Sequence, residues 1–186
     1  MKSDRRIWKK FRKGSKKAFS IIYHQHANAL YQFGLKFSNN PELVKDCIQE
    51  LFLRLIKSRK SLGTVRKIRP YLMVSIKRCI IKELQKKKNI IDFNSSKHLP
   101  FHIEYSLEES IMNNEIRDER IRELVAALKK LTPRQKEIVY LRFSCNLEYE
   151  EICDIMELTY DAARKLLYRS IKALRKAYII TNDQLN

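Results

Sequence analysis

The chain has 186 residues, of which 44% are apolar, and it carries a formal net charge of +18 at pH 7. Apolar residues are frequent enough to form a core, and no apolar run is long enough to cross a membrane. The composition therefore excludes a disordered chain and predicts no membrane insertion. The excess of Lys and Arg predicts a polyanionic partner, with a merely basic soluble protein and membrane-surface binding as alternatives.

Basic residues are most concentrated at the N-terminus. Residues 1–17 carry nine Lys or Arg side chains against one Asp, and no apolar segment follows these charges. We therefore predict no secretory signal and expect a cytoplasmic protein. We also predict that residues 1–17 form a basic, disordered tail, which either adds non-specific contact with DNA or serves solubility alone.

Residues 18–89 carry fifteen basic and four acidic side chains, and their apolar pattern predicts amphipathic helices. The first spans residues 18–37, where apolar residues recur with a period near 3.6. A second helix begins with Asn40 as N-cap and Pro41 at the first helical position. Its predicted inward positions are Val44, Ile48, Leu51, Phe52, Leu55 and Ile56.

A basic loop over residues 58–69 precedes a third helix, which Pro70 begins and which ends in the basic run 86–88. Its predicted inward positions are Leu72, Ile76, Ile80 and Leu84. Residues 89–105 show no sustained period and are typical of a linker.

A capping box at Ser106 and Glu109 predicts the start of a helix that continues to about residue 130, with Leu124 among its inward positions. A stronger start follows at Thr132, with a proline at the next position and Gln135 to close the box. A short helix over residues 149–156 and a long basic helix complete the chain.

The last two helices have the pattern of a helix-turn-helix. Ile152 and Ile155 form the inner face of the first helix, Cys153 is the small residue where the helices cross, and Thr159 caps the second. An inward stripe follows in the second helix at Ala163, Leu167, Ile171 and Leu174. Residues 164–177 carry six basic side chains and no acidic one, whereas residues 131–163 carry seven acidic and three basic ones.

The face opposite the inward stripe is predicted to bind DNA in the major groove. Arg and Lys on such a face reach phosphates and guanine edges, and a Tyr adds a phosphate hydrogen bond or an apolar base contact. The alternative is an amphipathic helix with a solvated basic face. The predicted DNA-binding residues are Arg164, Lys165, Tyr168, Arg169 and Lys172.

The motifs resemble those of a known family. Residues 131–142 (LTPRQKEIVYLR), 149–152 (YEEI) and 167–175 (LYRSIKALR) resemble domain four of bacterial sigma factors of the sigma-70 family. Residues 46–54 (DCIQELFLR) and 69–72 (RPYL), together with residues 19–31, resemble domain two. The resemblance is to the small extracytoplasmic-function (ECF) group, which keeps only these two domains.

The resemblance implies an all-α fold of two small helical domains, with three to four helices in domain two and a helix-turn-helix in domain four. Domain two would span residues 18–89, a flexible linker 90–115, and domain four 116–180, with the basic tail outside the match. The implied function is that of an RNA polymerase sigma factor, which binds core enzyme and directs initiation at promoters by recognising their −10 and −35 elements.

Roles for residues follow from the same resemblance. The second helix of domain two would bind the clamp coiled coil of the polymerase's largest subunit, because carboxylates and an amide suit its basic surface. These residues are Asp46, Gln49, Glu50 and Arg54. Residues that engage the opened −10 element would be Arg66, Lys67, Tyr71, Lys77, Arg78 and Lys82, although Tyr71 is better suited to the core than to base stacking.

The helix-turn-helix would read the −35 element, the linker would thread toward the RNA exit path, and the other partners would be the polymerase flap, promoter DNA and an anti-sigma factor. The chain departs from the family at three places. Glu157 stands where the turn usually has Gly, which makes a left-handed turn costly. Glu148 replaces the usual Ser cap, with Asn146 as an alternative cap, and Arg78 stands where Asn is common.

Catalytic chemistry is not indicated. The sequence has no Gly-rich phosphate loop, nucleophile elbow or carboxylate pair with a matching base, so we predict no enzyme and no cofactor. His24 and His26 have metal-like spacing but no paired Cys, and we predict no metal site. The four scattered cysteines are expected to be reduced, part-buried thiols.

Two other functions remain open from the residues. A free-standing transcription regulator would use the same helix-turn-helix on duplex DNA without polymerase, with residues 18–89 as a sensor or dimerisation domain. A basic helical RNA-binding protein would show no promoter selectivity.

Overall fold

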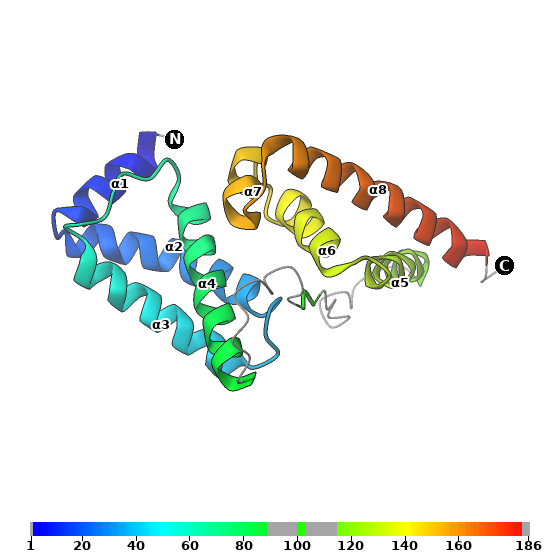
Figure 1. Cartoon of the computed structure of the whole chain (residues 1–186), viewed down its shortest axis with the longest axis horizontal. Coiled ribbons are helices and arrows are strands. Elements are labelled where there is room, and N and C mark those ends of the chain that lie inside the picture. The colour runs from blue at the N-terminus through cyan, green and yellow to red at the C-terminus, as the bar shows by residue number, and fades with distance from the viewer. Residues whose placement is uncertain (1, 89–99, 103–114, 184–186) are drawn as a thin grey trace. The chain divides into compact units, whose positions relative to one another are not determined.

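The computed structural model describes residues 2–88, 100–102 and 115–183, which form only helices and the loops between them (Figure 1). This confirms the prediction of an all-α fold. The chain divides into two compact units, Met1–Pro100 and Phe101–Asn186. The capping box predicted at Ser106 and Glu109 lies outside the described residues, as does most of the predicted linker.

The first unit contains four helices: α1 (Lys2–Arg12), α2 (Lys16–Gly34), α3 (Pro41–Ser58) and α4 (Ile68–Lys88). Two polar side chains satisfy the backbone at the helix starts. Ser15 Oγ accepts a hydrogen bond from the Ala18 N–H at 3.2 Å, and Asn40 Oδ1 accepts one from the Leu43 N–H at 3.1 Å. The predicted start of the second amphipathic helix at Asn40 and Pro41 is therefore confirmed.

Gly34 marks the place where α2 lies closest to its neighbours. A Cβ at this position would lie 2.6 Å from Val44 Cγ1 of α3 and 3.1 Å from Ile80 Cδ1 of α4, so only glycine fits without displacing them. The buried face of α3 meets α2 and α4 here through Leu43, Val44, Cys47, Ile48, Leu51, Phe52 and Leu55. Ile56, predicted to be buried with them, is 36% exposed, because it lies at the edge of the buried stripe while Leu55 in the same turn faces the core.

The N-terminal segment is not a tail. The prediction of disorder over residues 1–17 is wrong, because α1 occupies most of it and buries Trp8 and Phe11 to 2% and 3% exposure. The Trp8 ring lies 5.3 Å from the rings of both Phe11 and Tyr71, so α1 is packed against α4. The large apolar area of these rings offsets the cost of ordering a highly basic segment.

The second unit contains α5 (Glu115–Lys129), α6 (Pro133–Val139), a π-helical turn (Tyr140–Ser144), α7 (Tyr149–Met156) and α8 (Tyr160–Asp183). The capping box predicted at Thr132 is present. The Thr132 N–H donates to Gln135 Oε1 at 2.9 Å, and the Gln135 N–H donates to Thr132 Oγ1 at 3.4 Å. Leu124, predicted to be buried in α5, is 42% exposed.

The fluorescence of Trp8 tests the packing of α1, because Trp8 is the only tryptophan in the chain. A buried indole is shielded from solvent, so we expect blue-shifted emission and little quenching by acrylamide in the native protein, with both changing on unfolding in urea. Emission at the wavelength of free tryptophan, with full quenching before urea is added, would show that α1 is not docked.

Candidate functional site

The turn between α7 and α8 has a left-handed residue that is not glycine. Glu157 has φ 53° and ψ 55°, the conformation in which a Cβ meets the following carbonyl. The Leu158 N–H donates to Cys153 O at 3.1 Å, which closes the end of α7. Thr159 Oγ1 accepts a hydrogen bond from the Ala162 N–H at 3.3 Å, so the predicted cap of α8 is confirmed.

The start of α7 is held by charged side chains. Arg142 donates to Leu147 O at 2.8 Å and forms an ion pair of 3.2 Å with Glu148, the N-cap residue. Glu151 Oε2 accepts a hydrogen bond from the Glu148 N–H at 2.8 Å. The alternative cap at Asn146 is wrong, because Asn146 has a left-handed backbone (φ 51°) two residues before the cap position.

The inner face of α8 is set by small residues as much as by large ones. Ala163 and Leu167 are buried, whereas Ile171 and Leu174 are only half-buried. Ser170 is fully buried, and its hydroxyl donates to Leu166 O at 2.7 Å, which satisfies it inside the helix. The apolar periodicity of the sequence does not predict burial of Ser170, because it depends on hydropathy and takes no account of side-chain size.

The outer face of α8 carries the predicted DNA-binding side chains. All five, Arg164, Lys165, Tyr168, Arg169 and Lys172, are exposed. Tyr168 has 70% of its surface exposed, and the Arg164 guanidinium lies 5.9 Å from the centre of the Tyr160 ring. A groove beside them is lined additionally by Tyr149 of α7 and by Arg175. These two residues are not among the predicted DNA-binding side chains, although Arg175 belongs to the same all-basic run.

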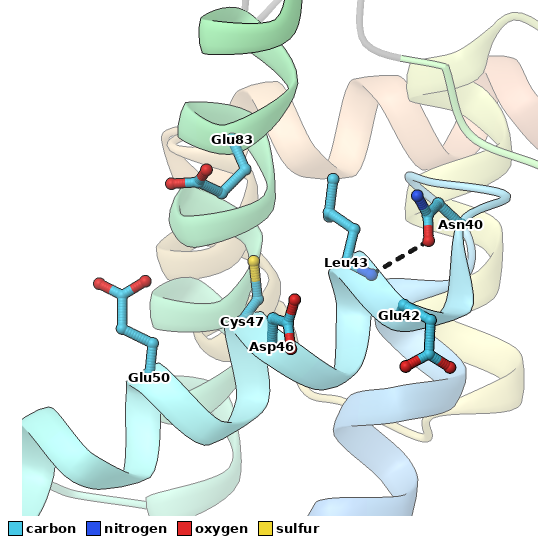
Figure 2. A pocket seen from close by; sticks show the side chains of 7 residues that line it. All are labelled: Asn40, Glu42, Leu43, Asp46, Cys47, Glu50 and Glu83. Carbon is cyan, nitrogen blue, oxygen red and sulfur yellow. Dashed lines mark hydrogen bonds between the residues drawn. The ribbon is translucent and has the colours of Figure 1, made fainter.

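The outer face of α3 differs in charge from the rest of the first unit. Asp46, Gln49, Glu50 and Arg54 are all exposed on it, as expected from the helical spacing. Figure 2 shows a recess on this face, where carboxylates from two helices surround Cys47. The carboxylates are those of Glu42, Asp46, Glu50 and Glu83. Glu83 was missed because it is brought to α3 from α4 by packing, which the spacing within one helix does not reveal.

One thiol, that of Cys47, lines this recess. A second buried thiol, Cys79 of α4, donates a hydrogen bond to Glu50 Oε2 at 3.5 Å. Burial raises the pKa of both thiols, and the neighbouring carboxylates raise it further. All four cysteines of the chain are free thiols, in agreement with the prediction.

The residues expected at the −10 element do not all share one surface. Arg66 is exposed and Lys67 half-buried in the loop before α4, and Arg78 and Lys82 are exposed one turn apart on α4. Lys77 is half-buried on another side of α4, where its ammonium lies 5.5 Å from the centre of the Phe37 ring.

Tyr71 is half-buried, and its ring packs edge-to-face on Trp8 at the start of α4. Of the two roles considered for Tyr71, the structure therefore supports a place in the core.

Two family models match the chain, "Sigma-70 region 2" over residues 22–90 and "Sigma-70, region 4" over residues 121–174. The ECF RNA polymerase sigma factor SigX of Bacillus subtilis is 21% identical over 169 residues, which are 90% of this chain and 87% of SigX. The RNA polymerase sigma factor CarQ of Myxococcus xanthus is 25% identical over 167 residues, covering 90% and 92% of the two chains.

Solved structures of similar fold include CnrH in complex with the cytosolic domain of CnrY, with a TM-score of 0.60 at 17% identity over 93% of this chain and 95% of that one. The sigma factor RpoE of Bartonella quintana, in complex with the anti-sigma factor NepR, also has a TM-score of 0.60, at 15% identity over 87% and 96%. Within the described residues, no helix combines the length and apolar character needed to cross a bilayer. The same residues contain no cluster of three or more His, Cys, Asp or Glu suited to a metal ion.

Replacing Glu157 with Gly should stabilise the turn. Glycine has no Cβ to clash at positive φ, so we expect Glu157→Gly to be more stable than Glu157→Ala by about 1 kcal/mol. The alanine variant is the matched control, since it loses the carboxylate but keeps the Cβ. Hydrogen exchange of the α7 and α8 amides measures the difference, and equal protection in the two variants would contradict the strain.

The buried thiols of Cys47 and Cys79 should be unreactive in the folded protein. Near pH 8.5, where an exposed thiol is about half ionised, we expect Cys47 and Cys79 to react with iodoacetamide much more slowly than in urea. Because their folded-state pKa is raised, their contribution to stability is present below about pH 8.5 and declines as the pH rises above it. Mass spectrometry of the alkylated cysteines measures the rates, and equal rates with and without urea would contradict burial.

Proposed function

The chain belongs to the sigma-70 family of RNA polymerase sigma factors, in its ECF group, and we propose that its two units divide promoter recognition between the −10 and −35 elements. The observation that carries this proposal is the presence of both matched regions, each with its charged faces turned outward. A free-standing regulator needs the helix-turn-helix but has no use for the polar face of α3.

The −35 element is assigned to α8. Its exposed face carries four cations and Tyr168, with the Thr159 cap at its N-terminal end and the short α7 packed against it. This is the arrangement in which a recognition helix enters the major groove, where Arg and Lys contact phosphates and guanine edges. Arg164 is the strongest candidate for a base contact, because it lies in the first turns of the helix, near the exposed Tyr160 ring.

The binding of core polymerase is assigned to α3. Asp46, Gln49 and Glu50 project from one exposed face, and Arg54 lies one turn beyond with its guanidinium 4.0 Å from the Glu50 carboxylate. Exposed carboxylates bind a basic coiled coil through charge-assisted hydrogen bonds. Glu42 and Glu83 line the same recess, and each forms an ion pair with a lysine of its own helix, Lys45 at 2.8 Å and Lys86 at 2.7 Å. We add them as polar neighbours of the residues that the sequence indicated.

The −10 element is assigned to the loop before α4 and to the exposed side of that helix. Arg66 and Lys67 in the loop, with Arg78 and Lys82 on the helix, supply the cations that track an opened strand. Lys77 contributes to this track less directly, because its ammonium is directed to Phe37.

An inhibitory protein partner is also proposed. CnrH and RpoE, which share this fold, were solved in complex with CnrY and with the anti-sigma factor NepR. A protein that covers the basic faces of α4 and α8 would prevent promoter binding, and its release would activate the factor.

Run-off transcription with purified core polymerase tests the proposed function. We expect promoter-dependent transcripts from a genomic library only when both core enzyme and this protein are present, and co-elution of the two on a sizing column. Tight binding to a palindromic duplex without polymerase, together with no transcripts, would instead favour the free-standing regulator.

Paired variants test the division of labour. Arg164→Ala should weaken −35-dependent initiation about fivefold to a hundredfold, the range for one lost base contact, and leave core binding unchanged. Asp46→Ala with Gln49→Ala should weaken core binding and leave DNA selectivity unchanged. Lys129→Ala, which removes an exposed charge from α5, is the control for net charge. Loss of the same step in both variants would contradict the assignment.

A further inference from the structure

Helix α1 is tied to the connection between α3 and α4. This connection runs beside α1 and leads into α4 (Figure 1), and two hydrogen bonds link the two segments across 55 and 64 residues of sequence. The sigma-70 region 2 match begins at residue 22, so α1 lies outside it. The same connection carries Arg66 and Lys67, two of the residues assigned to the −10 element.

Trp8 holds the middle of the connection. Its indole N–H donates to Gly63 O at 2.9 Å, and its buried ring packs against Tyr71 of α4. Residues 61 and 62 are already bonded back to the end of α3 through the Ser58 carbonyl. No atom lies within 4 Å of the place where a Cβ on Gly63 would be, so side-chain packing does not restrain Gly63. The hydrogen bond from the Trp8 indole restrains it instead.

Asp4 holds the end of the connection. Its carboxylate accepts a hydrogen bond from the Ile68 N–H at 3.0 Å, at the first residue of α4. The first N–H groups of a helix have no partner within it, and a negative charge is favourable at this end. Asp4 is the only acidic residue among the first 41, in a segment whose other charges are all basic.

Asp4 lies in a partly buried environment. His26 of α2 is half-buried beside it, and burial lowers the pKa of His26, with Asp4 and Arg69 as the nearby charges acting on it. Interactions of a carboxylate are screened less in such a place than on an open surface. The hydrogen bond to Ile68 therefore competes with water less than one on an open surface would.

We propose that α1 is a positioning element for the −10 loop, with Trp8 and Asp4 fixing the backbone of residues 63–68 so that Arg66 and Lys67 face the opened DNA strand. This inference rests on the proposed function. A loop held in its binding geometry loses less conformational entropy when DNA binds, which raises affinity. Because such a loop cannot rearrange around an altered base, it also favours the correct sequence over others. Burial of the Trp8 ring alone would need neither the indole bond nor Asp4.

The experiment uses full-length variants in reconstituted holoenzyme. Trp8→Phe keeps an aromatic ring but removes the indole N–H, Asp4→Ala removes the acceptor, and Asp4→Asn keeps one. Lys10→Ala, on the exposed side of α1, is the matched control. Permanganate reactivity measures opening of a promoter identified by run-off transcription and of the same promoter with one −10 base changed. The ratio between the two promoters is the readout, with core binding measured in parallel.

We expect Asp4→Ala and Trp8→Phe to reduce this ratio about fivefold or more, the effect of one lost hydrogen bond. Asp4→Asn and Lys10→Ala should retain it, and core binding should be unchanged in every variant. A purely structural role would lower opening of both promoters, and core binding, by the same factor, and this result would overturn the inference.

An unchanged ratio in Trp8→Phe and Asp4→Ala would also overturn the inference. If Asp4→Ala does not fold, the ratio measured for Trp8→Phe is sufficient to test it. If the unaltered protein opens neither promoter, the proposed function fails and the inference fails with it. An unchanged ratio overturns the inference alone, so the two failures are distinguishable.

Discussion

The close packing of α2 against α3 and α4 at Gly34 determines which faces of the two outer helices reach solvent. With 2.6 Å between a Cβ built at this position and Val44 Cγ1, any larger residue would force α2, or the side chains of α3 and α4 that meet it, to shift. The acidic recess over Cys47 and the cationic side of α4 both depend on this contact, because each is the outer face of a helix whose inner face meets Gly34. This close approach thus separates the surface that we propose for polymerase from the surface that we propose for DNA.

In the second unit, a strained turn at Glu157 determines which face of α8 is exposed. Glu157 holds a left-handed conformation so that α8 leaves α7 at the angle a helix-turn-helix requires, and Ala163 and Ser170 keep the inner face of α8 narrow enough to pack. All-basic charge then remains on the outer face. The cost at Glu157 is tolerated because the Leu158 bond to Cys153 and the Thr159 cap determine the turn from both sides.

Local signals in the sequence predicted most helix boundaries, since a cap such as Asn40 or Thr132 acts within three residues of itself. Features that depend on distant residues were missed. The high density of basic residues around Trp8 and Phe11 is typical of a tail, although these two apolar residues form the buried face of α1. Glu83 reaches the α3 face only through tertiary packing. The sequence likewise predicts that Lys77 and Arg78 act together at the −10 element. In the structure, however, the Lys77 ammonium lies over the Phe37 ring on another side of α4.

The central claim is that one polymerase-bound subunit contacts two promoter elements with two separate helices. Site-specific photo-crosslinking tests it directly, with the crosslinker placed in turn at Tyr168 of α8 and at Arg78 of α4, both exposed. The account predicts crosslinks to the −35 element from the first position and to the −10 element from the second, and at both positions only when core enzyme is present. Crosslinks from both positions to one DNA segment, or equal crosslinking without core enzyme, would contradict it.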